Sequence, residues 1–321
     1  MGNIPHRLST ARVGARKFEK IGHTAVAPNL LAPSEDVLLQ GRTCTSRVGA
    51  EGPRKEIPMS AVTSYEAGTP SFIDLATTDL DAAKAFYTGL FGWDAADMPM
   101  PQGGVYTMLS KGGKDVAGAY VLNAEMAEMG VPPHWVSYVT VADAEAAAFA
   151  VASAGGTVIA EPFDVFTAGR MAVASDPAGA TFSMWQPRES IGAYLVNEPG
   201  SLVWNELQTS DTDGAATFYQ AVFGWGTETT EMPTGTYTSF TIGDRGVAGM
   251  MEIRPEWGPV PPNWSIYLGV EDVDTAMAKA IAMGSKALME PMEVPNAGRF
   301  TMLSDPQGAV FYIMGVPPGD G

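Results

Sequence analysis

Cysteine and histidine are scarce in this chain of 321 residues. The one cysteine is Cys44, and of three histidines only His134 lies beyond residue 67. A single cysteine excludes an intramolecular disulfide and a zinc site of several thiolates, and it is typical of a protein in the reducing cytoplasm. With one histidine in the main part of the chain, a metal site there would need several convergent oxygen donors.

Long apolar runs and basic residues are also lacking. No apolar stretch approaches the ~20 residues that a membrane-spanning helix requires. Lys and Arg number 19 against 36 Asp and Glu. Nine of the 19, but only six of the 36, fall in residues 1–67, which leaves ten against thirty in the remainder. So acidic a body repels phosphate backbones, and we expect neither a nucleic-acid partner nor a membrane partner.

The first 67 residues differ from the rest. They mix Pro, Gly, Arg and Ser without hydrophobic periodicity, which predicts a disordered leader. They contain no apolar core followed by a small-residue cleavage site, so they do not resemble a signal peptide. Met59 is a candidate alternative start, because only a few polar residues separate it from the part described next. Residues 317–321 are expected to form a tail.

What the chain does contain is a long internal repeat. Residues 68–93 return at 200–225, a shift of 132, and residues 132–180 return at 261–309, a shift of 129. Both copies carry Phe-Tyr, then Phe-Gly-Trp, and later Asp-Pro-x-Gly. The change of shift predicts that the second copy lacks three residues within one loop. So long a period indicates a duplicated domain, with copies at 68–190 and 200–316.

Each copy is expected to contain, twice over, one strand, one helix and three strands. In the first copy the expected elements are a strand at 72–77, a helix from the N-cap Asp79 to Gly92, strands at 105–110 and 116–122, a strand at 135–141, a helix at 143–154, and strands near 158–159, 171–174 and 181–185. This predicts an α+β fold of two tandem domains, each of paired modules whose curled sheet surrounds a cleft. By alternation, positions 72 and 74 face that cleft. Pairing of the modules within a copy or between copies stays open.

The order of these segments resembles a known family. A strand, Asp-Leu-Asp, an Ala-rich helix with Phe-Tyr and Leu-Phe-Gly-Trp, and Asp-Pro-x-Gly before a last strand resemble the vicinal oxygen chelate superfamily. That superfamily includes glyoxalases, bleomycin-resistance proteins and extradiol dioxygenases. The resemblance covers residues 68–316 and is strongest to two-domain glyoxalase-like members labelled hydroxylases, some of which occur with antibiotic-tailoring genes.

The resemblance also implies where a metal would bind. Metal-using members hold a divalent ion with His, Gln or Glu on four strands around the cleft. The corresponding positions here are Phe72, Val136, Ser183 and one of 118–120 in the first copy, and Trp204, Ser265, Tyr312 and one of 249–251 in the second. None of them is His, Gln or Glu, so we expect no metal cofactor, although a divalent metal is what the family would imply.

Two matching carboxylates are candidate catalytic residues. Asp74 and Glu206 each lie two residues after the first lost ligand position and on the same face. A carboxylate in an apolar cleft has a raised pKa and can act as a general base or bind a cationic group. The alternative is a carboxylate paired with an Arg or a backbone amide. His134 is a third candidate, but its counterpart is Asn263, so it would serve one copy only or be a surface histidine.

The remaining candidates would bind the ligand. Arg170 and Arg299 occupy equivalent positions and would anchor a carboxylate or phosphate, or else form a structural salt bridge to Asp176, Asp305 or the strand carboxylate. Aromatic residues would line the clefts for a planar ligand or fill an ordinary core. They are Phe72, Trp135, Tyr138, Trp185, Trp204, Trp264, Tyr267 and Tyr312. Val136, Ser183 and Ser265, at the lost ligand positions, are candidate ligand-binding residues as well.

These features favour a glyoxalase-like or bleomycin-resistance-like protein that binds or transforms a small organic molecule in an aromatic-lined cleft, without a metal, in detoxification or secondary metabolism. One alternative is a metal-dependent lyase or dioxygenase. Another is a sequestering protein without catalysis. A monomer and a homodimer both remain open, because four modules in one chain already supply one another with partners.

Overall fold

The computed structural model describes residues 62–101, 103–232, 235–294 and 298–316. Nearly all of the expected leader, the candidate start Met59 and the tail lie outside the described residues. In the described ranges, no helix is both long and apolar enough to cross a bilayer.

The first copy forms one sheet with both of its modules side by side. Its elements are β1 (Pro70–Thr77), α1 (Leu80–Phe91), β2 (Asp94–Pro99), β3 (Val105–Lys111), β4 (Lys114–Val121), α2 (Ala124–Glu128), β5 (His134–Thr140), α3 (Ala144–Ser153), β6 (Thr157–Val165), β7 (Gly169–Ser175) and β8 (Thr181–Pro187). The strand order is β2-β3-β4-β1-β5-β8-β7-β6. Because β1 pairs antiparallel with β5, the modules join within the copy.

The second copy repeats this arrangement. Its elements are β9 (Leu202–Thr209), α4 (Thr212–Phe223), β10 (Gly226–Met232), β11 (Gly235–Ile242), β12 (Arg245–Glu252), the 3₁₀ turn η1 (Pro255–Trp257), β13 (Asn263–Val270), α5 (Val273–Ala282), β14 (Lys286–Ala287), β15 (Met292–Val294), β16 (Gly298–Ser304) and β17 (Val310–Gly315). The strand order is β10-β11-β12-β9-β13-β17-β16-β14, and β15 pairs with β16. The predicted tandem α+β fold is confirmed.

Local signals in the sequence account for the helices. The Asp79 carboxylate accepts a hydrogen bond from the Ala82 amide at 3.0 Å, and Gly92 ends α1 at φ 70°, in the left-handed region that favours glycine. Strand β2 was not predicted, because all six of its residues are exposed and show no apolar alternation.

The expectation of a single shortened loop was wrong. Asp74 pairs with Gly118, and Glu206 pairs with Gly249, so the shift through β4 and β12 is 131. One residue is therefore lost before β3, and the other two are lost between β4 and β5. Loop length changes at both places without disturbing the paired strands.

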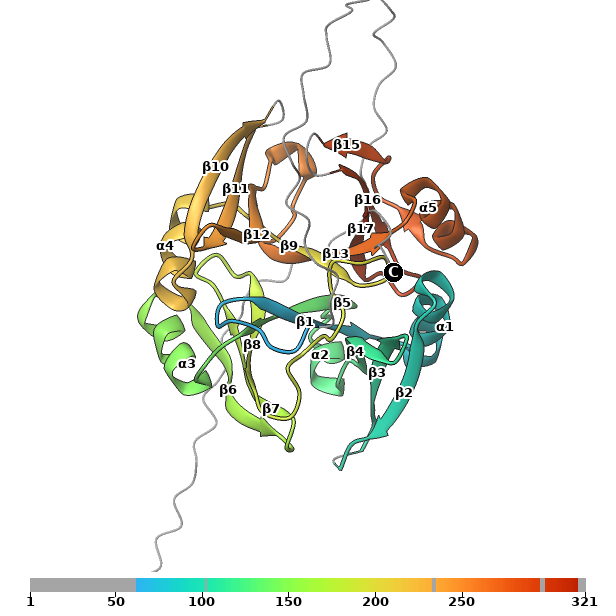
Figure 1. Ribbon diagram of the computed structural model, residues 1–321, viewed down its shortest axis with the longest axis horizontal. Coiled ribbons are helices and arrows are strands. Elements are labelled where there is room, and N and C mark those ends of the chain that lie inside the picture. The colour runs from blue at the N-terminus through green and yellow to red at the C-terminus, as the bar shows by residue number, and fades with distance from the viewer. Residues whose placement is uncertain (1–61, 102, 233–234, 295–297, 317–321) are drawn as a thin grey trace, which may run out of the picture.

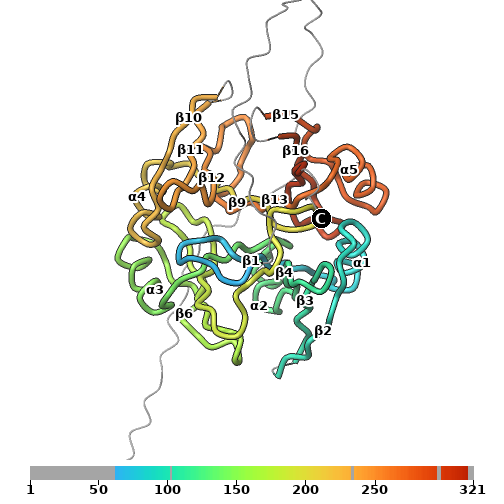
Figure 2. Tube along the Cα trace, in the orientation of Figure 1, coloured from blue at the N-terminus to red at the C-terminus, as the bar shows by residue number. Residues whose placement is uncertain are grey.

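The two sheets lie back to back and curl away from each other (Figure 1). In Figure 2 the first copy forms one half of the body and the second copy the other. Helix α1 packs against α5, α3 packs against α4, and the central strands β1 and β5 contact β9 and β13. Each of the two large apolar clusters contains residues from both copies. The copies therefore share one core.

The repeated motifs join the two copies. Tyr87 of the first Phe-Tyr donates to Asp305 Oδ2, and Tyr219 of the second donates to Asp176 Oδ2, both at 3.1 Å. Asp305 Oδ1 caps its own Asp-Pro-x-Gly turn by accepting three backbone amides, the last from Ala309. The two aspartates thus belong to an interface, with one oxygen holding a turn and the other holding the opposite copy.

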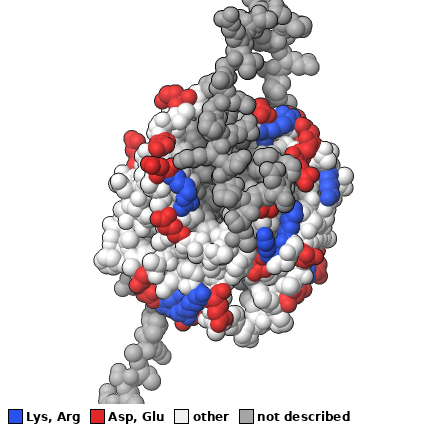
Figure 3. Space-filling view, viewed as in Figure 1, with Lys and Arg blue, Asp and Glu red and all other residues white. Residues whose placement is uncertain are grey.

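The tryptophans of Phe-Gly-Trp complete this interface. Trp93 Nε1 donates to the carbonyl of Gly200 at 2.7 Å, and Trp225 Nε1 donates to that of Gly68 at 2.8 Å. Acidic and basic side chains lie beside one another on the face in Figure 3, consistent with the salt bridges between described residues such as Arg245–Glu66.

Candidate ligand-binding site

We call the curled-in side of each sheet its concave face. On the first concave face lie Phe72, Asp74, Val136, Tyr138 and Ser183, and on the second lie Trp204, Glu206, Ser265, Tyr267 and Tyr312. The alternate residues of β1, such as Ile73 and Leu75, belong to the core shared by the copies. Phe72, Val136, Tyr138, Trp185 and the linker residue Ala193 form a separate buried cluster. The strand alternation thus places 72 and 74 on the concave face, as predicted.

A buried carboxyl is held between two phenols on the first concave face. Asp74 is 4% exposed, Tyr106 donates to its Oδ1 and Tyr138 donates to its Oδ2, each at 2.7 Å. Burial raises the pKa of Asp74 to about 6, and the two phenol hydrogen bonds limit the rise because they favour the carboxylate. Of the two alternatives, no Arg pairs with Asp74 among the described residues, whereas a backbone hydrogen bond at Gly118 also acts to lower the pKa of Asp74.

A glycine makes room for this cluster. Gly118 pairs with Asp74, and a Cβ at Gly118 would overlap Tyr106 Oη and Asp74 Oδ1. Gly249 has the same role on the second face, where a Cβ would overlap Tyr237 Oη. A side chain at either position would displace a phenol from the carboxyl cluster.

The second concave face has a matching carboxyl. Glu206 is 4% exposed and accepts from Tyr267 Oη at 2.9 Å. Burial raises the pKa of Glu206 to about 7, against the lowering effect of Tyr267, Tyr237 and Gln208. Tyr237 in turn accepts from Trp204 Nε1 at 2.8 Å. Both faces therefore hold a carboxyl that changes protonation near neutral pH.

Tyr106, Tyr237 and Gln208 were not predicted from the sequence. The signal was present, since Gly-Val-Tyr-Thr at 104–107 returns as Gly-Thr-Tyr-Thr at 235–238. The motif is hard to detect because it is short and its shift of 131 differs from the shifts of the longer segments, 132 and 129.

His134 stands at the beginning of β5, where it pairs with Ala76. Its Nδ1 lies 2.8 Å from the carbonyl oxygen of Pro132, and burial lowers its pKa. The ring is thus held at the end of the strand by the preceding turn.

Arg170 and Arg299 do not lie on the concave faces, so their expected role as ligand anchors is wrong, and each forms a structural salt bridge, the alternative role, instead. Arg170 lies on the same face of β7 as Ala172 and Ala174 of the shared core, and it forms salt bridges to Glu145 and Asp164. Arg299 binds Asp274 in the first turn of α5 at 2.8 Å. The partners also differ from those expected, because each arginine reaches the helix that covers its own sheet.

Trp135 and Trp264 likewise lie on the packed side. Trp135 Nε1 donates to Tyr87 Oη at 3.1 Å, and Trp264 Nε1 donates to Tyr219 Oη at 2.9 Å. They belong to the interface between the copies. Trp185 does join the first concave cluster, where its Nε1 donates to the carbonyl of Ser190 in the linker.

The residues at the family's ligand positions do not fit a divalent ion. Asp74, the carboxylate nearest to these positions on the first face, already receives a phenol on each oxygen. Gly118 beside it offers no side-chain donor. Within the described ranges, no three His, Cys, Asp or Glu side chains converge as metal ligands would.

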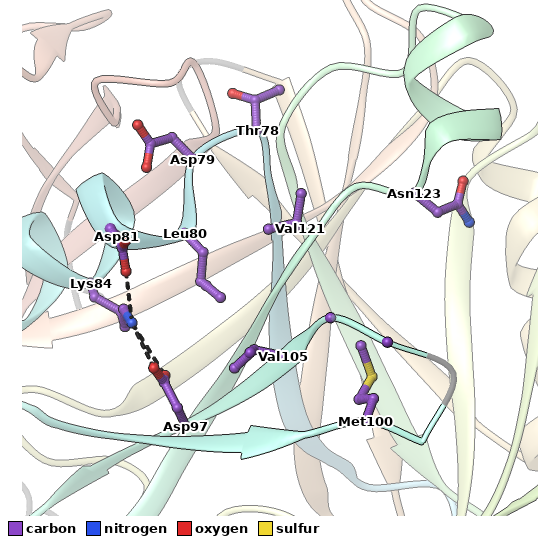
Figure 4. A pocket seen from close by; sticks show the side chains of 12 residues that line it. Thr78, Asp79, Leu80, Asp81, Lys84, Asp97, Met100, Val105, Val121 and Asn123 are labelled. Carbon is purple, nitrogen blue, oxygen red and sulfur yellow. Dashed lines mark hydrogen bonds and ion pairs between the residues drawn. The ribbon is translucent and has the colours of Figure 1, made fainter.

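A hollow of about 740 Å³ lies apart from both carboxyl clusters. It is bordered by the beginning of α1, the β2–β3 hairpin and the end of β4 (Figure 4). Lys84 points into it and binds Asp81 and Asp97, each at 2.9 Å. The charge of this lysine is therefore paired with its own neighbours.

Comparisons with known proteins agree with this geometry. A family model described as Glyoxalase/Bleomycin resistance protein/Dioxygenase superfamily matches residues 69–184 and 201–313. "Putative glyoxylase CFP32" of Mycobacterium tuberculosis is 44% identical over 256 residues, covering 79% of this chain and 97% of that protein. "Anthracycline biosynthesis protein DnrV" of Streptomyces peucetius is 36% identical over 268 residues, covering 80% and 97%.

Solved structures show the same fold at low sequence identity. The Mn(II)-bound glyoxalase from Novosphingobium aromaticivorans has a TM-score of 0.55 at 15% identity, covering 78% of this chain and 82% of that one. The 2,3-dioxygenase LapB from Pseudomonas sp. KL28 has a TM-score of 0.53 at 12% identity, covering 80% and 93%.

Proposed function

The chain belongs to the Glyoxalase/Bleomycin resistance protein/Dioxygenase superfamily, and we propose that it binds a small, partly aromatic carbonyl compound on a concave face and moves a proton on it without a metal. The observation that carries this proposal is the buried carboxyl between tyrosine hydroxyls, present in both copies. The relatives named for glyoxylase function and for anthracycline biosynthesis support a small organic ligand.

The carboxyl supplies the base. With a pKa of about 6 for Asp74 and about 7 for Glu206, a large fraction is ionised at neutral pH while the group stays basic enough to accept a proton. It removes a proton from the carbon next to a carbonyl group. A C–H bond breaks, and the electron pair moves toward the carbonyl oxygen.

The phenols supply the acid. Burial keeps the pKa of Tyr106, Tyr138 and Tyr267 well above the usual range, so these groups stay protonated and donate hydrogen bonds. A phenol that turns from the carboxyl to the carbonyl oxygen stabilises the enolate as negative charge develops. The carboxyl then returns its proton, either to the carbon or to the enolate oxygen, and is again a carboxylate; in the second case the product is the enol, in which O–H has replaced C–H.

An apolar aromatic wall suits a flat ligand. Phe72 meets Tyr138 edge-on at 6.0 Å between ring centroids, and Tyr267 stacks on Tyr312 at 4.4 Å. Rings in such a setting bind planar molecules by burial and stacking. Anthracyclines are polycyclic molecules of this kind, with carbonyl and hydroxyl oxygens.

The test is hydrogen–deuterium exchange of 2-tetralone in D₂O, followed by NMR with the full chain. We expect exchange at the carbons beside the carbonyl to exceed the buffer rate. The double variant Asp74→Asn/Glu206→Gln should bind 2-tetralone within about threefold of wild type but lose the rate enhancement. Binding without any enhancement in wild type would instead indicate a sequestering protein, and full activity in the double variant would refute the role of the carboxyls.

A further inference from the structure

We infer that the two concave faces are not equivalent, and that the ligand binds on the first, where the Ser183 hydroxyl fixes one of its oxygens beside the Asp74–Tyr138 pair. This inference rests on the proposed function and adds to it which copy binds and what the ligand must carry.

Ser183 has a buried hydroxyl without a use in the fold. Its residue is 1% exposed, and among the described residues its Oγ makes no hydrogen bond of acceptable geometry. It stands opposite Tyr138 on the adjoining strand, where burial raises the pKa of the phenol and the Ser183 hydroxyl opposes that rise, and Tyr138 donates its own hydrogen bond to Asp74. An unpartnered hydroxyl in a core is costly, and replacing it by a small apolar group would remove that cost. A ligand oxygen at this depth would satisfy it.

The second concave face has no such free group at the corresponding position. Tyr312 stands opposite Tyr267 as Ser183 stands opposite Tyr138. Its ring stacks on Tyr267, and its hydroxyl accepts from Gln208 Nε2 at 2.9 Å. The chain's own phenol therefore occupies the place that a ligand oxygen and ring would take on the first face.

Neighbouring replacements strengthen the contrast. In matching register, Ala76 on the first face corresponds to Gln208 on the second, and Val136 corresponds to Ser265. Gln208 and Ser265 both take part in hydrogen bonds within the second face, to Tyr312 and Asn263 respectively. The polar side chains of the second face thus form hydrogen bonds within that face, whereas their counterparts on the first face are apolar.

These positions define the ligand class. One carbonyl or phenol oxygen of the ligand meets the phenols at Asp74 on β1, and another meets Ser183 on β8, two strands away in the sheet. Phe72 and Trp185 belong to the same buried cluster, so their rings would form the aromatic wall for a planar ligand bound at these oxygens. A quinone or hydroxyquinone with oxygens on both edges has this pattern.

The test is isothermal titration calorimetry of 1,8-dihydroxyanthraquinone with the full chain, which gives the affinity and the number of molecules bound. We expect one molecule bound per chain. Ser183→Ala should weaken binding about fivefold to tenfold while leaving the unfolding midpoint unchanged or higher, since the hydroxyl has no partner in the free protein. Ser183→Tyr, which installs the residue of the second face, should abolish binding.

The matched control is Ser285→Ala, at a buried serine outside both carboxyl clusters whose hydroxyl donates to the carbonyl of Ser304 at 2.7 Å. It should lower the unfolding midpoint by a few degrees, because that hydrogen bond is lost, and leave binding unchanged. Two molecules per chain, unchanged binding in Ser183→Ala, or weaker binding in Ser285→Ala would each overturn the inference while leaving the proposed function intact. If the wild type binds neither this quinone nor 2-tetralone, the proposed function itself fails.

Discussion

Replacing Glu206 by Gln should flatten the dependence of stability on pH. Glu206 is buried, and its pKa is raised from 4.5 to about 7 because burial disfavours the charged form. The folded state therefore holds the proton at pH values where the unfolded state has released it. The stability from this group is present at low pH and is lost as pH rises from about 4.5 through about 7.

The magnitude follows from the two pKa values. The whole shift corresponds to about 3 kcal/mol of unfolding free energy, of which about 2.5 kcal/mol is lost between pH 5 and pH 8. Glutamine keeps the shape but carries no proton equilibrium, so this part of the decline should vanish in Glu206→Gln. Asp74→Asn should remove a smaller part, about 1.4 kcal/mol, because the pKa of Asp74 rises only to about 6.

The assay is urea unfolding of wild type and variants at pH 5, 6, 7 and 8. The quantity compared is the difference in unfolding free energy between wild type and variant, so that other titrating groups cancel. The exposed Glu228→Gln is the control and should follow the wild-type profile. If the Glu206→Gln difference stays constant within about 0.5 kcal/mol over this range, a buried carboxyl with a raised pKa is excluded.

Three further outcomes are expected. Gly118→Ala should lower the free energy of unfolding by about 1–3 kcal/mol, because a Cβ there overlaps Tyr106 and Asp74. The control Gly246→Ala, whose Cβ would have its nearest atom at 3.6 Å, should lower it far less. Equal losses in urea titrations would contradict this. Tyr87→Phe removes the hydrogen bond to buried Asp305 and should cost about 1–3 kcal/mol, again by urea titration, with the copies still unfolding in one transition. Elemental analysis of protein purified without chelators should find no stoichiometric transition metal, and EDTA should leave the unfolding midpoint unchanged. A near-stoichiometric metal would refute the proposed metal-free chemistry.

The fold was largely predictable from the sequence, because its signals are local and occur twice. Asp79 caps α1 and Gly92 ends it, as expected from short-range geometry alone. Strand alternation correctly placed Phe72 and Asp74 on one face. The repeat, the helix caps and this alternation are sufficient to predict the tandem α+β architecture. Strand β2 could not be predicted, because an exposed edge strand has no apolar pattern.

The partners of each side chain were decided only by the tertiary structure. Asp74 meets Tyr106 from 32 residues away, and Tyr87 meets Asp305 from 218 residues away. Arg170 was expected to anchor a ligand or to form a salt bridge to Asp176 or a strand carboxylate, but it binds Glu145 in the helix that covers its own sheet. A strand pattern gives the face on which a residue lies, whereas the group that it touches depends on the register of strands distant in sequence and on how the two copies pack. The sequence by itself therefore determined where the carboxyls lie, and the tertiary structure decided that phenols surround them.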